Sequence, residues 1–437
     1  MTIKRTKTIR RILVLATSIA MAFGLSSCGL TDEKSAEFKP LLSTETECQI
    51  KVAGNYSNFE SLESEFERFY EYYPNVSLNY VNLDDYNNTI TSALMSDEAP
   101  DIYVTATWML EDDKMAPVFE NAEVLSDPSL NINLDCLRKG TCWTLENGDV
   151  VMLPIFTRTY GMLVNMDLFE MNGLEVPKNY NELVDVCDKL KAAGYEVPIM
   201  GANGMTVAGM YYAFAFPYFC DYVIKNPESV EALNSMEKSS GEMMRPALER
   251  IKAFVDAGYL NPGLCSEQIE DDYNAVIMRF FEGDVPIMLG SGDMVSGTQK
   301  RESKSEAFLA NSFKYKFFIV PTGDDGGYFL DSVNLFFSVN KNSQNLDMTN
   351  EFIRFLMREE ELGNMAAIKR LTTPSNDFSF DEVYSSLEGF PEDKTFSYQE
   401  TGLNDAVNKE FRAAAYNVAN GIMTVDEAIS GYGSLWE

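Results

Sequence analysis

Hydrophobic residues follow two different periods along the first part of the chain. Apolar and polar positions alternate between residues 49 and 53, which predicts a short strand that ends at Gly54. In the segment 57–73 apolar residues recur every three to four positions, and this period predicts an amphipathic helix that Pro74 stops. Alternation returns in "VSLNYV", residues 76–81, so we predict a second strand there. The apolar positions of the helix are Phe59, Leu62, Phe66, Phe69 and Tyr73.

The same order of elements recurs further along the chain. Residues 84–106 contain a second helix pattern, a break at Pro100 and another strand pattern. Residues 157–195 read as a strand, a short helix and, after Pro177, a long helix over 179–193 that ends at Gly194. Strands that alternate with helices of this length predict an α/β fold with largely parallel sheets, whose functional loops lie at the carboxyl ends of the strands.

The first residues form a pattern of a different kind. Basic residues precede an apolar run of 14 residues, Ile12 to Leu25, which suits a signal peptide and is shorter than the roughly 20 residues of a membrane-spanning helix. Leu25, Ser26, Ser27 and Cys28 resemble a bacterial lipoprotein box, whose cysteine is lipidated. We therefore expect a signal peptide over 1–27, a lipidated tether over 28–47, and a protein anchored to the outer face of the cell membrane. The alternative is an uncleaved chain in which Cys28 is buried or paired.

The charge of the chain restricts its partners. Lys and Arg together number 35, whereas Asp and Glu number 67, so the formal net charge is -32. A surface this acidic repels phosphate backbones, which argues against nucleic acid as a partner. Hydrophobic residues make up 45% of the chain, enough for large cores and about two domains.

The absence of histidine removes much of known enzyme chemistry. With no histidine in the chain, Ser-His-Asp and Cys-His systems and H-E-x-x-H zinc sites are excluded. The cysteines form no C-x-x-C pair, and Cys136 and Cys142 are either a local disulfide or two free thiols. The acidic turn "GDDGG", 323–327, lacks the spacing of an EF-hand, so we expect neither a metal site nor a cofactor.

Five segments of the chain, in the order in which they occur, resemble the extracellular solute-binding proteins of ABC importers, in the branch that includes maltose-binding protein. They spread over nearly the whole chain that follows the predicted tether. The segments are "SALMSDEAPDIYV", "ENGDVVMLPIFTRTYGMLVNMDLFEMNGLEVPKNYNEL", "RFFEGDVPIMLGSGDM", "SVNKNSQNLDMTNEFIRFLM" and "ANGIMTVDEA".

This resemblance implies a two-lobed periplasmic-binding-protein-like fold of type II, in which each lobe is a mostly parallel sheet flanked by helices. Lobe 1 would comprise 48–157 and 333–372, and lobe 2 would comprise 158–332 and 373–437. The chain would cross between the lobes near 155–159, 329–334 and 371–374. The implied function is capture of a small polar solute, with carbohydrate as the leading class, by hinge closure and its delivery to a membrane permease. The protein would be a monomer and not an enzyme.

The resemblance also implies which residues touch the solute. The loop after the first strand contributes Asn55 and Tyr56, and the loop after "PDIYV" contributes Thr105, Thr107 and Trp108. Trp108 can stack on a sugar face, or it can pack under the edge of the lobe. The remaining candidates are Arg158, Tyr160, Tyr211, Asp293, Met294 and Asn408.

Several of these positions depart from the sugar-binding pattern. Arg158 occupies the place of a frequent acidic contact, and it could bind solute or form a hinge salt bridge. Asp293 with Met294, and Asn408, stand where maltose binders place stacking aromatic residues. Tyr160, Tyr211 and Tyr212 could replace them, but "MYYAFAFPYF" is apolar enough that core packing is the stronger interpretation for that segment.

Two other functions are compatible with the composition. A surface glycoside hydrolase would use a pair of the many carboxylates as acid and base, although no spacing singles out such a pair. A noncatalytic adhesion lipoprotein would bind no small solute at all. Turnover, saturable binding without product, and absence of binding distinguish the three.

Overall fold

The computed structural model describes residues 37–207, 209–262, 273–376 and 381–436. The predicted signal peptide, Cys28, the first part of the predicted tether and Cys265 lie outside the described residues. Within the described part of the chain, no helix combines the length and the apolar character needed to span a bilayer.

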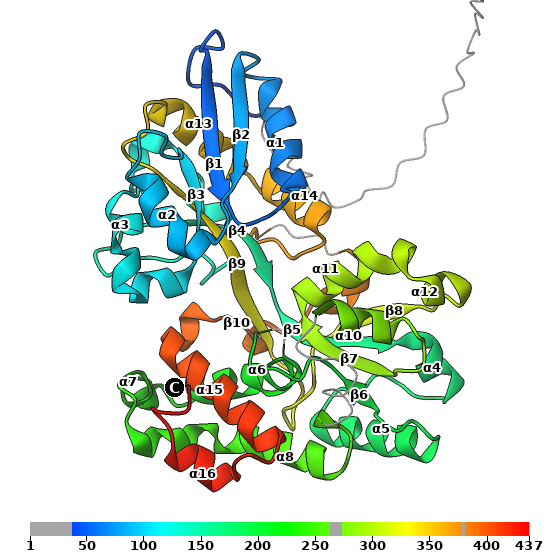
Figure 1. Cartoon of the computed structure of the whole chain (residues 1–437). Coiled ribbons are helices and arrows are strands. Elements are labelled where there is room, and N and C mark those ends of the chain that lie inside the picture. The colour runs from blue at the N-terminus through cyan, green and yellow to red at the C-terminus, as the bar shows by residue number, and fades with distance from the viewer. Residues whose placement is uncertain (1–36, 208, 263–272, 377–380, 437) are drawn as a thin grey trace, which may run out of the picture. The chain divides into compact units, whose positions relative to one another are not determined.

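The structure alternates strands and helices, with short 3-10 turns between them (Figure 1). The strands are β1 (Cys48–Gly54), β2 (Val76–Asn82), β3 (Ile102–Thr105), β4 (Leu153–Arg158), β5 (Tyr160–Asn165), β6 (Ile199–Met200), β7 (Ile287–Ser291), β8 (Tyr315–Phe318), β9 (Phe329–Val339) and β10 (Thr395–Ser397). The α-helices are α1 (Glu60–Tyr70), α2 (Tyr86–Leu94), α3 (Ala116–Glu120), α4 (Met166–Met171), α5 (Tyr180–Ala192), α6 (Met210–Ile224), α7 (Val230–Asn234), α8 (Arg245–Asp256), α10 (Tyr273–Phe280), α11 (Gly292–Arg301), α12 (Glu306–Ala310), α13 (Leu346–Leu356), α14 (Glu359–Lys369), α15 (Asp405–Ala419) and α16 (Val425–Ser430). The 3-10 turns are η1 (Thr107–Glu111), η2 (Asp113–Met115), η3 (Pro128–Leu130), η4 (Leu134–Cys136), η5 (Pro227–Ser229), η6 (Lys238–Met244), η7 (Glu302–Lys304), η8 (Glu382–Leu387), η9 (Glu392–Lys394) and η10 (Gln399–Thr401).

The predicted strands and helices of the first part of the chain are confirmed. β1, α1, β2, α2 and β3 occur in the predicted order. Phe59, Leu62 and Phe69 are fully buried, as the helical period indicated. The long helix α5 begins after the cap Asn179, whose side chain accepts the backbone N–H of Glu182.

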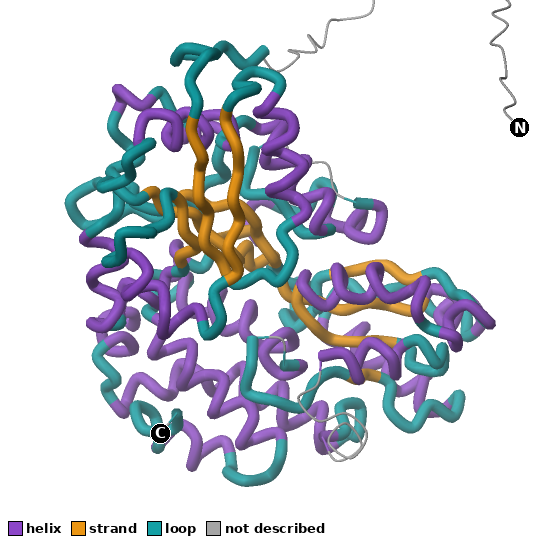
Figure 2. Tube along the Cα trace, turned by 45° about the horizontal axis from the view of Figure 1, so that its top comes forward, coloured by secondary structure: helices purple, strands orange, loops and turns teal. Residues whose placement is uncertain are grey.

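The first sheet is mixed, and its parallel strands carry the loops that the sequence singled out. β1 runs parallel to β2 and β3, while β9 is antiparallel to β3 and β4 and parallel to β10. Helices α1, α13 and α14 pack against one another, and α2 packs against α3 (Figure 1). The carboxyl ends of β1 and β3 lie at the end of this sheet where β4 and β9 cross to the second sheet (Figure 1). Figure 2 shows the strands, in orange, flanked by helices, in purple.

The second sheet differs from the prediction of a mostly parallel arrangement. β5 is antiparallel to both β7 and β8, and β6 runs parallel to β7. The reason is that β5 enters this sheet directly from β4, whereas β7 and β8 run back toward that entry point. The backbone N–H of Gly292, just after β7, donates to the carbonyl of Thr159 just before β5, at 3.0 Å.

Each sheet has its own hydrophobic core, so the chain folds into two α/β lobes. We call the part around β1–β3 lobe 1 and the part around the second sheet lobe 2. Between β4 and β5, Phe156 belongs to the lobe 1 core and Tyr160 to the lobe 2 core. Within β9, Leu330 belongs to the lobe 2 core and Leu335 to the lobe 1 core. The limits of the lobes, 48–157 with 333–372 and 158–332 with 373–437, stay a prediction.

The end of the predicted tether is part of lobe 1. Phe38 is only 4% exposed, and its ring packs edge-on against Tyr72 and Phe355, with centroids 5.1 and 5.2 Å away. The guanidinium of Arg354 lies 4.3 Å from the centre of the Phe38 ring. Any free tether within 28–47 therefore has to end before Phe38, because from that residue onward the chain is packed on the lobe.

Candidate functional site

The two faces of the crossing strands carry different side chains. Arg158 pairs with Ser332 across β4 and β9, and Thr157 pairs with Val333. Because successive strand residues point to opposite faces, Arg158 and Asn334 share one face, while Thr157 and Asp331 share the other. We call the first the Arg158 face and the second the Arg138 face, after the cation that contacts each.

An ion pair occupies the Arg158 face. Arg158 Nη1 donates to Asp293 Oδ2 at 2.7 Å, and the two side chains are 20% and 33% exposed. Asn334 Nδ2 donates to the other carboxylate oxygen of Asp293 at 3.3 Å. Asp293 lies in the first turn of α11 in lobe 2, where the helix dipole favours a carboxylate. Of the two roles that the sequence allowed for Arg158, the structure shows a salt bridge.

Tyr56 brings lobe 1 to this ion pair. Its backbone N–H donates to the hydroxyl of Tyr80 at 3.0 Å, and Lys369 Nζ lies 4.6 Å from the centre of its half-buried ring. Burial raises the pKa of the Tyr56 phenol, nearby Asp293 raises it further, and Arg158 opposes the shift. The phenol is therefore within electrostatic reach of the pair. Asn55, the other residue of this loop that was predicted to touch the solute, is exposed.

The loop after β3 places its residues at different depths. Thr105 is fully buried and shares a hydrogen bond of 3.0 Å with Ser338, so its hydroxyl is used inside lobe 1. Thr107 is half-buried and lines a cavity of about 30 Å³ together with Trp143. Trp108 is half-buried and packs against the lobe 1 core, which leaves part of its ring accessible.

Three of the predicted contacts are core residues instead. Tyr160, Tyr211 and Met294 are buried in the lobe 2 core, and the Tyr211 hydroxyl donates to Asn203 Oδ1 at 2.9 Å. Helix α6, which carries Tyr211, is buried over nearly its whole length, so apolar residues on all of its sides contact the surrounding core. In this structure the three side chains pack inside lobe 2, and their contact with a solute stays a prediction. Tyr212, buried in the same core, stacks on Phe216 with centroids 4.1 Å apart.

Asn408 is half-buried on α15. Its side-chain oxygen is shielded from solvent and has no hydrogen-bond partner within the described structure. Asn408 lies about one turn after the start of α15.

The start of α15 also makes a contact with lobe 1 that the sequence did not predict. Glu111 of η1 accepts the backbone N–H of Asp405, with its two oxygens at 3.0 and 3.1 Å.

A second lobe-to-lobe contact was also missed. Glu60, at the start of α1, lies 3.4 Å from Lys300 Nζ of α11 and 2.9 Å from Lys369 Nζ of α14. No local sequence signal indicates these pairs, because charged residues on exposed helix faces are common and their partners are set by the fold.

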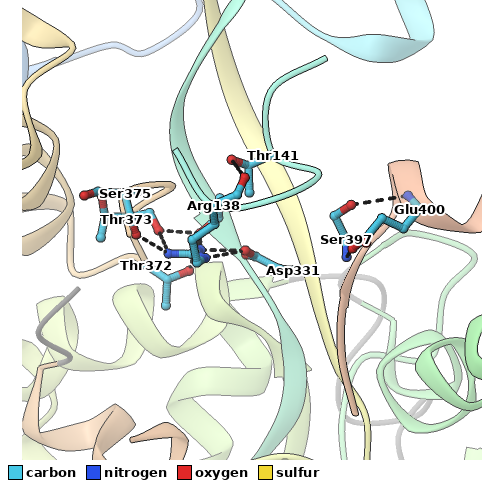
Figure 3. A network of polar contacts seen from close by, with 9 residues as sticks. Arg138, Thr141, Asp331, Thr372, Thr373, Ser375, Ser397 and Glu400 are labelled. Carbon is cyan, nitrogen blue, oxygen red and sulfur yellow. Dashed lines mark hydrogen bonds and ion pairs between the residues drawn. The ribbon is translucent and has the colours of Figure 1, made fainter. Parts of the chain in front are cut away.

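The Arg138 face holds a polar network that the sequence did not indicate (Figure 3). Arg138 makes an ion pair with Asp331 on β9 and donates to Thr157 Oγ1 on β4 at 3.1 Å. It also donates to the carbonyl of Thr373, in the predicted third crossing 371–374, and to that of Ser375 just after it. A cavity of about 570 Å³ adjoins this network and is lined by Arg138, Asp331 and the aromatic residues Phe329, Phe390 and Phe396.

The remaining chemical candidates have structural roles. Cys136 and Cys142 are free thiols, which settles the alternative left open by the sequence. In the turn 323–327, Asp324 pairs with Arg250 and Asp325 with Lys394. Among the described residues, no cluster of three or more acidic or cysteine side chains could hold a metal ion.

Comparison with known proteins connects this site to a family. A family model described as "Bacterial extracellular solute-binding protein" matches residues 53–362. No curated protein matches the sequence significantly. The apo form of RafE from Streptococcus pneumoniae has a TM-score of 0.67 at 17% identity, covering 92% of this chain and 100% of that chain.

Two similar structures contain sugars. RafE in complex with raffinose has a TM-score of 0.64 at 17% identity, over 89% of this chain and 100% of that chain. A sugar transporter from Bacillus licheniformis in complex with stachyose has a TM-score of 0.59 at 15% identity, over 89% and 100%. These likenesses confirm the two-lobed fold. Because the family model also spans most of the sequence, the chain belongs to the bacterial extracellular solute-binding proteins.

Proposed function

We propose that the protein is the solute-binding component of an ABC importer and that it captures a carbohydrate at the Arg158 face. The observation that carries this proposal is the convergence on one ion pair of groups from both lobes and the crossing strands. Arg158 comes from β4, Asn334 from β9 and Asp293 from lobe 2, and Tyr56 of lobe 1 lies near enough for both charges to act on its pKa. A solute bound there contacts every moving part at once.

The side chains at this point suit sugar hydroxyl groups. A carboxylate accepts from hydroxyls, while a guanidinium and an amide donate to them, and Asp293, Arg158 and Asn334 supply these groups. The half-buried ring of Tyr56 lies near this pair, and the loop after β3 carries the half-buried ring of Trp108; both rings suit stacking on a pyranose. Similar structures hold raffinose and stachyose, which supports the same class of solute here.

Binding is coupled to closure of the two lobes. A solute that touches both lobes binds the closed arrangement better than the open one, and this difference in affinity drives closure. The contacts of Glu60 with Lys300 and of Glu111 with Asp405 join the lobes directly. Closure presents one surface to a membrane permease, and the protein itself performs no chemistry.

The lipid anchor belongs to the same proposal. Cys28 is lipidated after removal of 1–27, and the chain between Cys28 and Phe38 holds a monomeric binding protein at the outer face of the membrane. Labelling of growing cells with a radioactive fatty acid tests this: the wild-type protein incorporates label and Cys28→Ser does not. Equal labelling of the two proteins contradicts the anchor at Cys28.

Intrinsic fluorescence and small-angle scattering test the binding function together. The protein is titrated with raffinose, stachyose and chitin oligosaccharides, and the reaction mixtures are analysed for cleavage products. We expect a saturable change with at least one sugar, a smaller radius of gyration in its presence, and no product. Product formation points to a glycoside hydrolase, and silence toward all sugars overturns the carbohydrate proposal.

A further inference from the structure

We propose that Asp293 determines specificity by making the site accept neutral saccharides and exclude anionic ones. The inference rests on the proposed function, because it concerns which carbohydrates the same site binds. Its starting point is Arg158. An arginine with no partner at a binding site recruits carboxylates through paired hydrogen bonds, so Arg158 considered by itself would suit an acidic solute.

In the structure, Asp293 compensates the positive charge of Arg158 that would attract a solute carboxylate. Arg158 Nη1 is 2.7 Å from Asp293 Oδ2, so the positive charge already has a carboxylate at contact distance. Both side chains keep some exposure, at 20% and 33%, so an approaching solute meets the pair as a unit. A uronate that reaches for Arg158 therefore meets Asp293 as well.

Asp293 is held in place by neighbours other than Arg158. Its second oxygen accepts from Asn334 Nδ2 at 3.3 Å, and its position in the first turn of α11 favours the carboxylate. The start of α11 is fixed to the crossing strands, because the Gly292 N–H donates to the Thr159 carbonyl at 3.0 Å. A solute carboxylate cannot displace Asp293 from Arg158 without breaking these contacts.

The nearby lysines do not change this balance. Lys300 and Lys369 both lie against Glu60, at 3.4 and 2.9 Å, and Glu63 is a second carboxylate near Lys369, so two negative charges face the two lysines. A solute carboxylate next to Arg158 would consequently be repelled by Asp293 at a separation of a few ångströms, where partial burial keeps the repulsion strong. A hydroxyl group has no such penalty, since it can donate to Asp293 and accept from Arg158 at the same time.

Asp293→Asn provides the test, because it keeps the size and the hydrogen-bonding oxygen and removes the charge. The affinities of the wild type and the variant for trigalacturonate and for its neutral counterpart galactotriose are measured by calorimetry at neutral pH and low ionic strength. We expect Asp293→Asn to bind trigalacturonate about tenfold tighter than the wild type does, because the charge of Arg158 is no longer compensated. Galactotriose should bind the variant no tighter than the wild type, because its hydroxyl groups lose a charged acceptor. The gain should shrink as salt is added, because ions screen the newly exposed charge of Arg158.

Asp324→Asn is the matched control. Asp324 also pairs with an arginine, Arg250, at 2.8 Å, but it is 81% exposed and lies in the turn 323–327 on lobe 2. This variant removes the same charge from an arginine pair elsewhere, so it should leave both affinities unchanged. An equal gain in the control means that net charge alone is responsible and overturns the inference.

The outcomes separate the inference from the proposed function. A wild type that binds trigalacturonate as tightly as galactotriose, or an Asp293→Asn variant with no gain, overturns the role of Asp293 while carbohydrate binding stands. If raffinose, stachyose, the chitin oligosaccharides and both trisaccharides bind neither the wild type nor the variant, the proposed function fails and the inference fails with it.

Discussion

Arg138 Nη2 and Asp331 Oδ2 lie 2.5 Å apart, on the face of the crossing strands opposite Arg158 (Figure 3). The two side chains are 13% and 5% exposed, so this pair is largely shielded from water. The same guanidinium donates to the Ser375 carbonyl at 2.9 Å and to Thr157 Oγ1 at 3.1 Å. The guanidinium of Arg138 therefore contacts β4, β9 and the segment next to the predicted third crossing between the lobes.

Arg138→Met should destabilise the protein by about 3 kcal/mol, because it leaves the buried carboxylate of Asp331 without its counter-charge. Urea unfolding followed by far-ultraviolet circular dichroism measures the change. Lys189→Met is the control: it removes an exposed pair with Asp185, whose side chain is 61% exposed, and should cost less than about 1 kcal/mol. Similar small losses in both variants would show that Arg138 does not hold the crossing segments together.

Trp108→Ala should weaken binding of the captured sugar by about tenfold or more, because a stacked ring contributes strongly to a sugar contact. The partial packing of Trp108 on the lobe 1 core adds a stability loss, which we expect to stay near 2 kcal/mol, below that of a fully buried aromatic residue. Calorimetric titration and thermal unfolding separate the two effects. Trp436→Ala is the control, since Trp436 lies over Arg412 near the C-terminus. A large stability loss with unchanged affinity would assign Trp108 to the core alone.

Local signals predicted the elements well. The period of three to four in α1, the alternation in β2 and the cap Asn179 of α5 all depend on residues close in sequence. Gly194, which was predicted to end that helix, adopts a left-handed conformation with φ of +100°. The strand directions of the second sheet could not be predicted in this way, because they depend on how β7 and β8 return to β5.

The site was predictable only in part, for the same physical reason. The resemblance placed Arg158 and Asp293 at the site, but their pairing joins residues 135 positions apart. Glu60 with Lys300 and Arg138 with Asp331 are even further apart in sequence, by 240 and 193 positions, and no periodicity marks them. Tyr211 shows a different difficulty. An aromatic residue in an apolar segment can line a binding surface or pack in a core, and only its packing in the structure distinguishes these two roles.

Phe38→Ala should destabilise lobe 1 by about 3 kcal/mol, because it removes a buried aromatic ring and leaves a cavity against Tyr72 and Phe355. Chemical unfolding of the variant tests this, with Leu41→Ala as the control. Leu41 is 58% exposed, and its backbone N–H still reaches Glu351 when the side chain is removed, so its loss should be under about 0.5 kcal/mol. Equal stabilities of Phe38→Ala and the wild type would return this segment to the flexible tether.

Glu65 lies on α1 facing α14 and is fully buried. Neither of its carboxylate oxygens has a hydrogen-bond partner within the described structure, although Arg68 Nε forms an ion pair with Glu65 Oε2 at 3.4 Å. Arg68 instead donates to Glu360 and Glu361, at 2.7 and 2.8 Å. Burial, together with the neighbouring Glu361, raises the pKa of Glu65 to about 8, although Arg68 opposes the shift.

This pKa predicts a stability that falls as pH rises. Between the ordinary value of 4.5 and about 8, the folded state keeps the Glu65 proton that the unfolded state has lost, so the free energy of unfolding decreases across this window and levels off above it. Glu65→Gln keeps a neutral side chain at every pH. It should match the wild type within about 1 kcal/mol at pH 5 and exceed its stability by on the order of 4 kcal/mol at pH 9. Urea unfolding at several pH values measures both curves, and Glu67→Gln, an exposed carboxylate on the same helix, should follow the wild-type slope. Parallel curves for the wild type and Glu65→Gln would mean that Glu65 is ionised in the folded protein and that its charge is compensated by Arg68.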